Sequence, residues 1–189
     1  MRHSLPNLKG HFLIAMPTLA EGFFAHSLTY LCDHSENGAM GLVINRPMEL
    51  SLGEVLEHLK FQGDGGEHQD DPVMAGGPVH TDRGFVLHRP AGREWESTLQ
   101  LSDDIALTTS RDILSAIACN EGPGDMLVAL GYAGWGAGQL EEELAANTWL
   151  TVPAQADIIF NTPHDKRLAA AAATLGIDLA LLAPGAGHA

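Results

Sequence analysis

The stretch from Gly131 to Leu150, GYAGWGAGQLEEELAANTWL, most constrains how this chain can fold. It follows an apolar run, Met126 to Leu130, that has the length of a buried strand. It leads into a segment whose Leu140 and Leu144 lie four residues apart, as one face of a helix requires. The sequence therefore predicts a strand, a glycine loop and a helix in that order, with the glycines letting the backbone turn sharply around Trp135.

The glycine loop before this helix does not have the sequence of a phosphate-binding site. Gly134, Gly136 and Gly138 give Gly-x-Gly-x-Gly, without the lysine and hydroxyl residue of a P-loop or the spacing of a dinucleotide fingerprint. Glutamates 141–143 occupy the first helical turn, where they complement the helix dipole and repel a bound anion. We therefore expect no nucleotide at this helix.

The length and composition are those of one folded domain. The chain has 189 residues, of which 45% are hydrophobic and 18% charged. A domain of this size buries about 70% of its unfolded surface, and the composition is far from that of a disordered chain. No linker or internal repeat divides the sequence. We expect a single domain over residues 1–189, with frayed ends at residues 1–8 and 183–189.

The cysteines and the N-terminal segment indicate a cytoplasmic protein. Cys32 and Cys119 are the two cysteines, and such scarcity fits a reducing compartment better than a disulfide scaffold. The first apolar run is short and is cut by Pro17, so it resembles neither a signal peptide nor a membrane span.

The charge balance disfavours direct contact with nucleic acid. The chain has 24 acidic and 10 basic residues apart from histidine, a formal net charge of −14. Binding to DNA or RNA normally rests on basic side chains that neutralise phosphates. The one arginine cluster, Arg83, Arg89 and Arg93, is diluted by Asp82 and Glu94. The same charge favours a well-solvated surface.

The first part of the chain is predicted to form strands and one short helix. Strands are expected at His11–Ala15, Leu28–Cys32 and Met40–Ile44, and the turn dipeptide Asn37-Gly38 predicts an antiparallel hairpin between the last two. Ser51 to Glu54 is a capping box, which predicts the start of a helix.

The remainder continues with strands in runs and interspersed helices. Val73–Ala75 and Gly84–His88 are predicted strands, separated by Gly76-Gly77-Pro78, which marks a tight turn or a close backbone approach. Without strict alternation of strand and helix, a mixed sheet in an α+β domain fits best. The other expected elements are strands at Thr98–Leu101, Ile105–Thr108 and Asp157–Phe160, a helix that Ser110 begins, and a helix from Thr162-Pro163 to Gly176 that buries Leu168, Ala172 and Leu175.

Distinctive motifs occur along most of the chain. They are HFLIAMP (residues 11–17), YLCDH (30–34), GAMGLVINRP (38–47), GGPV (76–79), RGFVLH (83–88), TTSRD (108–112), GYAGW (131–135) and GQLEEE (138–143). With these motifs the chain resembles the bacterial AlgH/YqgE family, in register from His11 to Ala189. The resemblance implies a single α+β domain whose mixed, mostly antiparallel sheet bends toward a pseudo-barrel with flanking helices. It implies no reaction: the family is uncharacterised and carries the label of a transcriptional regulator.

Potential metal ligands are present without a metal-binding motif. Cys32, His34, His80 and His88 are weak candidates, but the chain has neither HExxH nor CxxC. Cys32 and His34 would share a strand face only if the strand continues that far. They could also form a nucleophile and base, yet residues two apart rarely reach that geometry, so Cys32 is expected to be a buried core residue. We expect no metal and no cofactor.

Polar side chains beside glycine turns at strand ends predict a ligand pocket. Arg83 could pair with a carboxylate, and Trp135 and Tyr132 could stack on a ligand. Alternatively, Arg83 or Arg46 bridges to Glu141 or Glu143 within the protein. The candidate ligand-binding residues are Asn45, Arg46, Gly76, Gly77, Arg83, Trp135, Gln139 and Glu141.

Two functions remain open from the sequence. The first is a cytoplasmic regulatory or interaction protein without enzymatic activity, which acts through a protein or small-ligand partner and not through a membrane or direct DNA binding. The alternative is an enzyme that uses a metal or an arginine pocket to act on a small anionic substrate. A stoichiometric partner protein would favour the first, and a copurified metal or metabolite the second.

Overall fold

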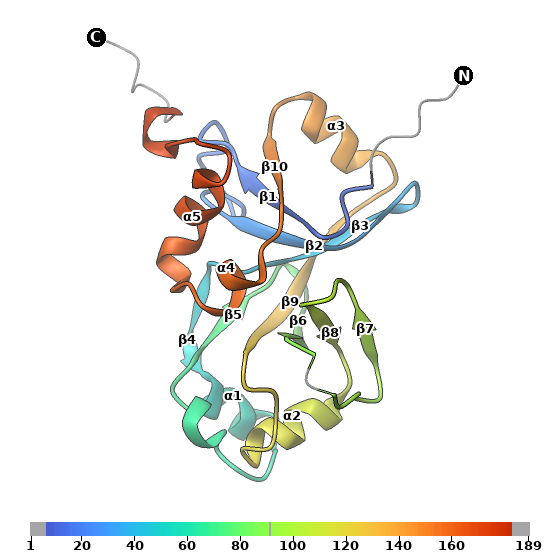
Figure 1. The fold of residues 1–189 in the computed structure, drawn as a ribbon, viewed down its shortest axis with the longest axis vertical. Helices are drawn as coiled ribbons and strands as arrows, with labels where there is room; N and C mark the ends of the chain where they lie inside the picture. The colour runs from blue at the N-terminus through green and yellow to red at the C-terminus, as the bar shows by residue number, and fades with distance from the viewer. Residues whose placement is uncertain (1–6, 91, 183–189) are drawn as a thin grey trace.

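A curved ten-stranded sheet is the framework of the chain in the computed structural model, which describes residues 7–90 and 92–182 (Figure 1). The strands are β1 (His11–Ala15), β2 (Leu28–Ser35), β3 (Gly38–Val43), β4 (Pro47–Ser51), β5 (Pro72–Ala75), β6 (Val79–His88), β7 (Thr98–Gln100), β8 (Ala106–Thr108), β9 (Met126–Trp135) and β10 (Trp149–Pro153). The main path runs β10-β1-β2-β3-β9-β6-β8-β7, and β4 and β5 branch from β9.

The strand pairing is mixed and mostly antiparallel. Among the described strands, only β5 and β9 pair in parallel, with Met74 opposite Ala129. β10 pairs with the outer edge of β1, so strands from both ends of the chain lie side by side. The curled, mostly antiparallel sheet confirms the predicted α+β fold class.

Short helices cover both faces of this sheet. They are α1 (Leu52–His58), α2 (Arg111–Ala118), α3 (Gln139–Ala145), α4 (Ala156–Phe160) and α5 (Arg167–Ala173), with 3₁₀ turns at Gly66–His68, His164–Lys166 and Leu179–Leu182. Figure 1 shows α1 and α2 at one end of the molecule and α3 at the other, with α4 and α5 along one side. In the described part of the chain, none of the helices has the length and apolar character needed to cross a bilayer.

Three apolar clusters hold the layers together. The largest lies on the inner face of the curved sheet, where Phe12, Tyr30 and Leu87 pack with Ile159 of α4 and Ala172 of α5. A second joins α1 and α2 to the outer face of β6 and β9. The third joins α3 to the outer face of the strands near β1 and β10. The helices therefore close the sheet into a half-barrel by burying apolar surface on both sides.

Local sequence signals placed several elements correctly. β2 and β3 form the predicted hairpin, with Ser35 opposite Gly38. The hydroxyl of Ser51 accepts a hydrogen bond of 3.3 Å from the backbone N–H of Glu54, so Ser51 is the N-cap of α1 as predicted. Ser110 precedes α2, whose buried side includes Ile113 and Ile117.

The central strand β9 differs from the prediction. The glycine-rich segment GYAGW was expected to leave the strand and turn around Trp135, but it continues β9 to Trp135. Gly134 lies opposite Met40 of β3, and Gly131 has φ +79°, which glycine adopts without strain. The glycines therefore allow close strand crossing, and the loop before α3 is confined to residues 136–138.

Two further predictions in the last third of the chain were wrong. Residues 157–160 belong to α4 and not to a strand, because a short apolar run such as Ile158-Ile159-Phe160 fits either structure. The strand is instead Trp149–Pro153, which was not predicted. α5 ends at Ala173, so Leu175 lies beyond it and is 42% exposed, not buried.

The predicted chain ends lie partly outside the described residues. Residues 1–6 and 183–189 are not described. Leu8 is buried, and its backbone N–H donates a hydrogen bond of 2.9 Å to Nδ1 of His34.

Gly76 and Gly77 bring two backbone segments into direct contact, which satisfies the close approach predicted from the sequence. The N–H of Gly76 donates to the carbonyl of Leu130, and the carbonyl of Gly76 accepts from Val43, each at 2.8 Å. A Cβ atom on Gly77 would lie 1.9 Å from the carbonyl carbon of Tyr132. This contact involves backbone on both sides, so no side-chain movement can relieve it.

We expect Gly77→Ala to destabilise the fold, because the added methyl group forces β9 and the β5–β6 connection apart. Overpacking of this kind costs about 3 kcal/mol, which lowers the midpoint of thermal unfolding by about 6–12 °C in a chain of this size. Circular dichroism during heating measures the change. Gly134→Ala is the matched control, since its Cβ would lie at ordinary contact distance, 3.5 Å from the Tyr132 ring. Equal midpoints for both variants would contradict the expectation.

Candidate functional site

Helix α3 uses its acidic side chains inside the protein. Oε1 of Glu143 accepts hydrogen bonds from the indole N–H groups of Trp135 (3.1 Å) and Trp149 (3.0 Å), and Oε2 accepts one from Gln139 (3.0 Å). Oε1 of Glu141 lies 2.5 Å from Nε2 of His34. The predicted bridges from Arg46 or Arg83 to Glu141 or Glu143 are therefore not formed.

The bond between Glu141 and His34 has a defined direction. Because Nδ1 of His34 accepts from Leu8, the ring proton is on Nε2 and is donated to the carboxylate. This hydrogen bond lowers the pKa of Glu141 below its ordinary value of 4.5. The charge-assisted bond fastens α3 to β2 and to the segment before β1.

A β-bulge separates Cys32 from His34. The pairing of β2 with β3 shifts between Leu31 and Asp33, so Cys32 is an extra residue in the strand. Cys32 is 3% exposed and packs on the inner face of the sheet, whereas His34 contacts Leu8 and α3 on the outer face. Burial raises the pKa of the Cys32 thiol. β2 does continue past His34, which was the condition for Cys32 and His34 to lie on one face of the strand. The bulge nevertheless places the two side chains on opposite faces, so they do not form a nucleophile and base pair.

The four weak metal candidates lie in different surroundings. Cys32 and His34 are on opposite faces, and His80 stacks on Tyr132 with ring centroids 5.9 Å apart. His88 is buried, with Nε2 2.8 Å from the hydroxyl of Thr108, and burial lowers its pKa. Within residues 7–90 and 92–182, no three His, Cys, Asp or Glu side chains are grouped as metal ligands.

Asn45 and Arg46 hold a neighbouring loop. The side chain of Asn45 accepts from the N–H of Leu28 (2.9 Å) and donates to the carbonyl of His26 (3.0 Å). Arg46 donates to the carbonyl of Ala25 (2.9 Å), and its guanidinium carbon lies 4.8 Å from the centre of the Phe23 ring. These two candidates therefore secure the segment before β2 and do not join Arg83.

Arg83 lies between two adjoining hollows on β6. The first, of about 580 Å³, is open and has Met40, Arg83 and Tyr132 in its wall. The second, of about 420 Å³, contains His80, Arg83 and Arg111.

Trp135 also borders the first hollow, although its indole packs in the cluster beneath α3. Of the eight predicted ligand residues, the structure places Arg83 and Trp135 at one hollow, with Gly76 and Gly77 fixing the backbone beside Tyr132.

The arginines of this region are free to meet a ligand. Among the described residues, neither Arg83 nor Arg111 forms an ion pair with an acidic side chain. Arg83 lies 5.4 Å from the centre of the Phe85 ring, and Arg111 lies 4.5 Å from that of Phe61, which orients both cations. His80 has φ +46°, a strained value for a residue other than glycine that recurs at functional sites.

The model of the family described as AlgH-like matches residues 12–180. The chain belongs to this family. A protein of Thioalkalivibrio sulfidiphilus is 58% identical over 183 residues, which cover 97% of each chain, and one of Pseudomonas fluorescens is 57% identical with 96% of each chain covered. Both belong to a group designated only as UPF0301.

Two solved structures agree with the fold of this AlgH-like chain. The AlgH protein from Pseudomonas aeruginosa, whose solution structure is known, is 55% identical in sequence to this chain. The two structures match with a TM-score of 0.80 over 100% of both chains. A crystal structure of a Corynebacterium diphtheriae protein has a TM-score of 0.74 at 18% identity, with 97% and 94% of the chains covered, and supports the fold alone.

Sequence reasoning missed Met40 and Arg111 as members of the Arg83 region of the AlgH-like chain. Arg111 belongs to the TTSRD motif, but its place opposite Arg83 depends on the packing of α2 against β6. Met40 reaches the hollow through the pairing of β3 with β9, opposite Gly134. Neither pairing has a local signal in the sequence.

Glu141→Gln is expected to lower the free energy of unfolding by about 1 kcal/mol at pH 7, because a neutral amide accepts a weaker hydrogen bond than a carboxylate. Since the pKa of Glu141 is lowered in the folded chain, its contribution is complete above pH 4.5 and is lost as the pH falls below that value. Urea unfolding at several pH values measures both effects.

Glu142→Gln is the control on the same helix, because Glu142 is exposed and its side chain makes no hydrogen bond to residues 7–90 or 92–182. If Glu141→Gln and Glu142→Gln gave equal changes, or if the Glu141→Gln effect did not decrease at all as the pH was lowered below 4.5, the His34 bond would not be the cause.

Proposed function

We propose that this AlgH-like chain is a cytoplasmic regulatory or interaction protein whose partner, a protein segment or a small ligand carrying a carboxylate, binds around Arg83. The proposal rests on one observation above the others: Arg83 borders two open hollows and forms no ion pair with the described acidic residues. A guanidinium in this state offers a planar set of donors that matches a carboxylate.

The electrostatics of the surface support an acidic partner. The chain carries a formal charge of −14, yet Arg83 and Arg111 border the same hollow together with His80. In such a chain a local group of cations directs an acidic partner to one place, while the remaining surface repels it. Asp82 in the same wall restricts the partner to an orientation that keeps its carboxylate near the arginines.

The apolar part of the region also suits binding. Met40, Phe85 and Tyr132 border the larger hollow, and methionine, aromatic and arginine side chains are enriched where proteins contact one another. Tyr132 is held between His80 and Phe85, with ring centroids 5.9 Å and 5.7 Å away. A rigid aromatic face next to an unpaired arginine binds a partner at low cost in side-chain entropy.

Arg83→Gln is expected to weaken partner binding about tenfold, the equivalent of about 1.4 kcal/mol, because one charge-assisted hydrogen bond is lost. Immobilised wild type is expected to retain a stoichiometric partner from lysate, which mass spectrometry would identify. Titration of that partner then gives the dissociation constant for each variant.

The matched control is Arg93→Gln, because Arg93 lies over the Trp95 ring at 4.0 Å and borders a different hollow. Equal binding by Arg83→Gln and wild type would exclude this site. A copurified metabolite that the protein converts to a product would favour the enzymatic alternative.

Duplex DNA is expected to show no shift in gel mobility with the protein at physiological salt, because a chain of charge −14 does not replace the counterions of the phosphate backbone. A basic DNA-binding domain under identical conditions is the positive control. A shift that weakens as salt increases would contradict the proposal of an action without direct DNA contact.

A further inference from the structure

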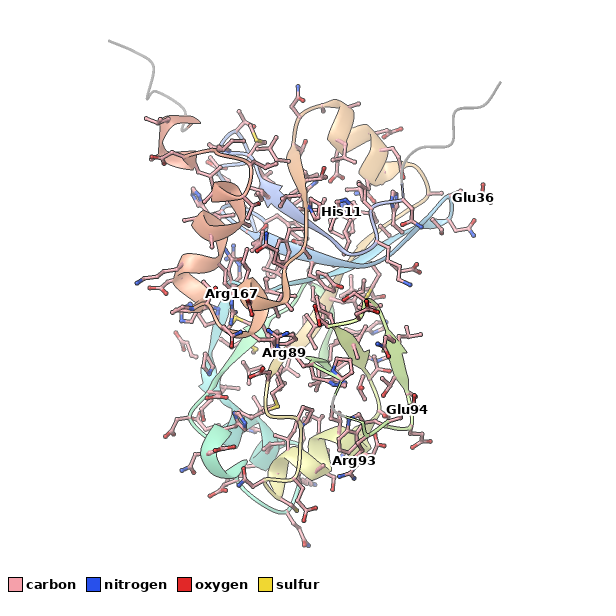
Figure 2. The ribbon with its side chains drawn as sticks, viewed as in Figure 1. His11, Glu36, Arg89, Arg93, Glu94 and Arg167 are labelled. Carbon is pink, nitrogen blue, oxygen red and sulfur yellow. The ribbon has the colours of Figure 1, made fainter. Side chains whose placement is uncertain are left out.

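A separate cavity of about 370 Å³ lies between the C-terminal helices and the strands β5 and β9. Its wall shares no residue with the two hollows at Arg83. Figure 2 shows Arg167 where α5 approaches β4 and β5. The volume falls within the range of small-molecule sites.

Arg167 is a cation at this cavity whose hydrogen-bond partners in the described part of the chain are neutral. Its Nε donates to the carbonyl of Thr162 at 3.0 Å, and its Nη1 donates to the carbonyl of Ile44. Both acceptors are neutral, and Arg167 forms no ion pair among residues 7–90 and 92–182. Burial lowers the pKa of Arg167 to about 10, since the charge is removed from water without compensation.

Two acidic groups near the cavity have polar partners other than Arg167. Asp71, which borders the cavity, lies 2.7 Å from Nδ1 of His68. Asp157 in α4 is 2.8 Å from Nη2 of Arg89, which also pairs with Asp125 at 2.9 Å. Neither carboxylate is paired with Arg167, so the guanidinium is available to a ligand that enters from solvent.

The rest of the wall is divided into an apolar side and a polar side. Leu52, Met74 and Val128 form part of the apolar side. Asn161 and His164 stand with Arg167 on the segment that enters α5. A site of this composition suits a molecule with one polar end and an apolar body.

We propose that this cavity binds a small monocarboxylate with an apolar chain, its carboxylate on Arg167 and its chain against β5 and β9. The ligand supplies a negative charge that no described residue brings to Arg167 as an ion pair. It also covers apolar side chains at the junction of the C-terminal helices with the sheet, so binding stabilises that junction by mass action.

Octanoate is the probe, and isothermal titration calorimetry on the full chain is the measurement. We expect saturable binding to wild type, with at least tenfold weaker binding to Arg167→Gln and to 1-octanol, which lacks the carboxylate. Arg93→Gln is the matched control and should bind octanoate as wild type does, because Arg93 borders a hollow that shares no residue with this cavity. Loss of octanoate binding in Arg83→Gln, with binding by Arg167→Gln unchanged, would place the carboxylate at Arg83 and overturn the present proposal without contradicting the proposed function.

Arg167 contributes to the fold through Thr162 and Ile44, so circular dichroism checks each variant. Met126→Trp tests the cavity without changing the cation, because a larger side chain at Met126 fills the apolar side. It should also reduce octanoate binding at least tenfold. No saturable binding to wild type, equal binding of octanoate and 1-octanol, unchanged binding by Met126→Trp, or binding of inorganic phosphate in place of octanoate would each overturn the proposal.

Discussion

The close backbone crossing at β9 is the constraint on which the rest of the structure depends. β9 pairs with β3 near its C-terminal end and with β5 and β6 near its start, so one strand carries the sheet from one half of the molecule to the other. Gly76 and Gly77 lie against Gly131 and Tyr132 without room for a Cβ atom. The glycine-rich motifs that look like ligand loops in the sequence are therefore needed for packing.

Most of the polar side chains in and around α3 form hydrogen bonds within the protein. The glutamates of α3 accept hydrogen bonds from Trp135, Trp149 and His34, which bind the helix to the outer face of the sheet. Two of the side chains in these bonds, Trp135 and Glu141, are ones that the sequence suggested for a ligand. Arg83 and Arg167 differ from these α3 side chains, because neither guanidinium forms an ion pair with a described carboxylate. In an acidic chain, unpaired arginines beside cavities are the groups with free binding capacity.

The sequence was sufficient where the signal is local. Short apolar runs and turn residues located β1 and the β2–β3 hairpin, and the serine N-cap located α1, because each depends on neighbouring residues. Prediction from the sequence failed where the same residues fit either a strand or a helix. The run at Ile158 forms a helix because β10 already occupies the edge of β1, a choice made by distant contacts.

The candidate site was harder to predict for the same reason. Arg83 and Tyr132 could be named from residue type and nearby glycines, but their grouping with Met40 and Arg111 needs the packing of α2 and the β3–β9 register. Cys32 and His34 are close in sequence, yet the structure separates their side chains. Their spacing suggests a common face, and a single extra residue in β2, which has no sequence signature, separates them.

The pairing of β10 with β1 has a consequence for how the chain is made. His11 lies opposite Pro153, so the strand that covers the outer edge of β1 is synthesised more than 130 residues after it. An open strand edge can pair with other molecules, and contacts between distant residues form slowly. The edge of β1 in the newly synthesised chain is therefore open to pairing with other molecules until β10 covers it.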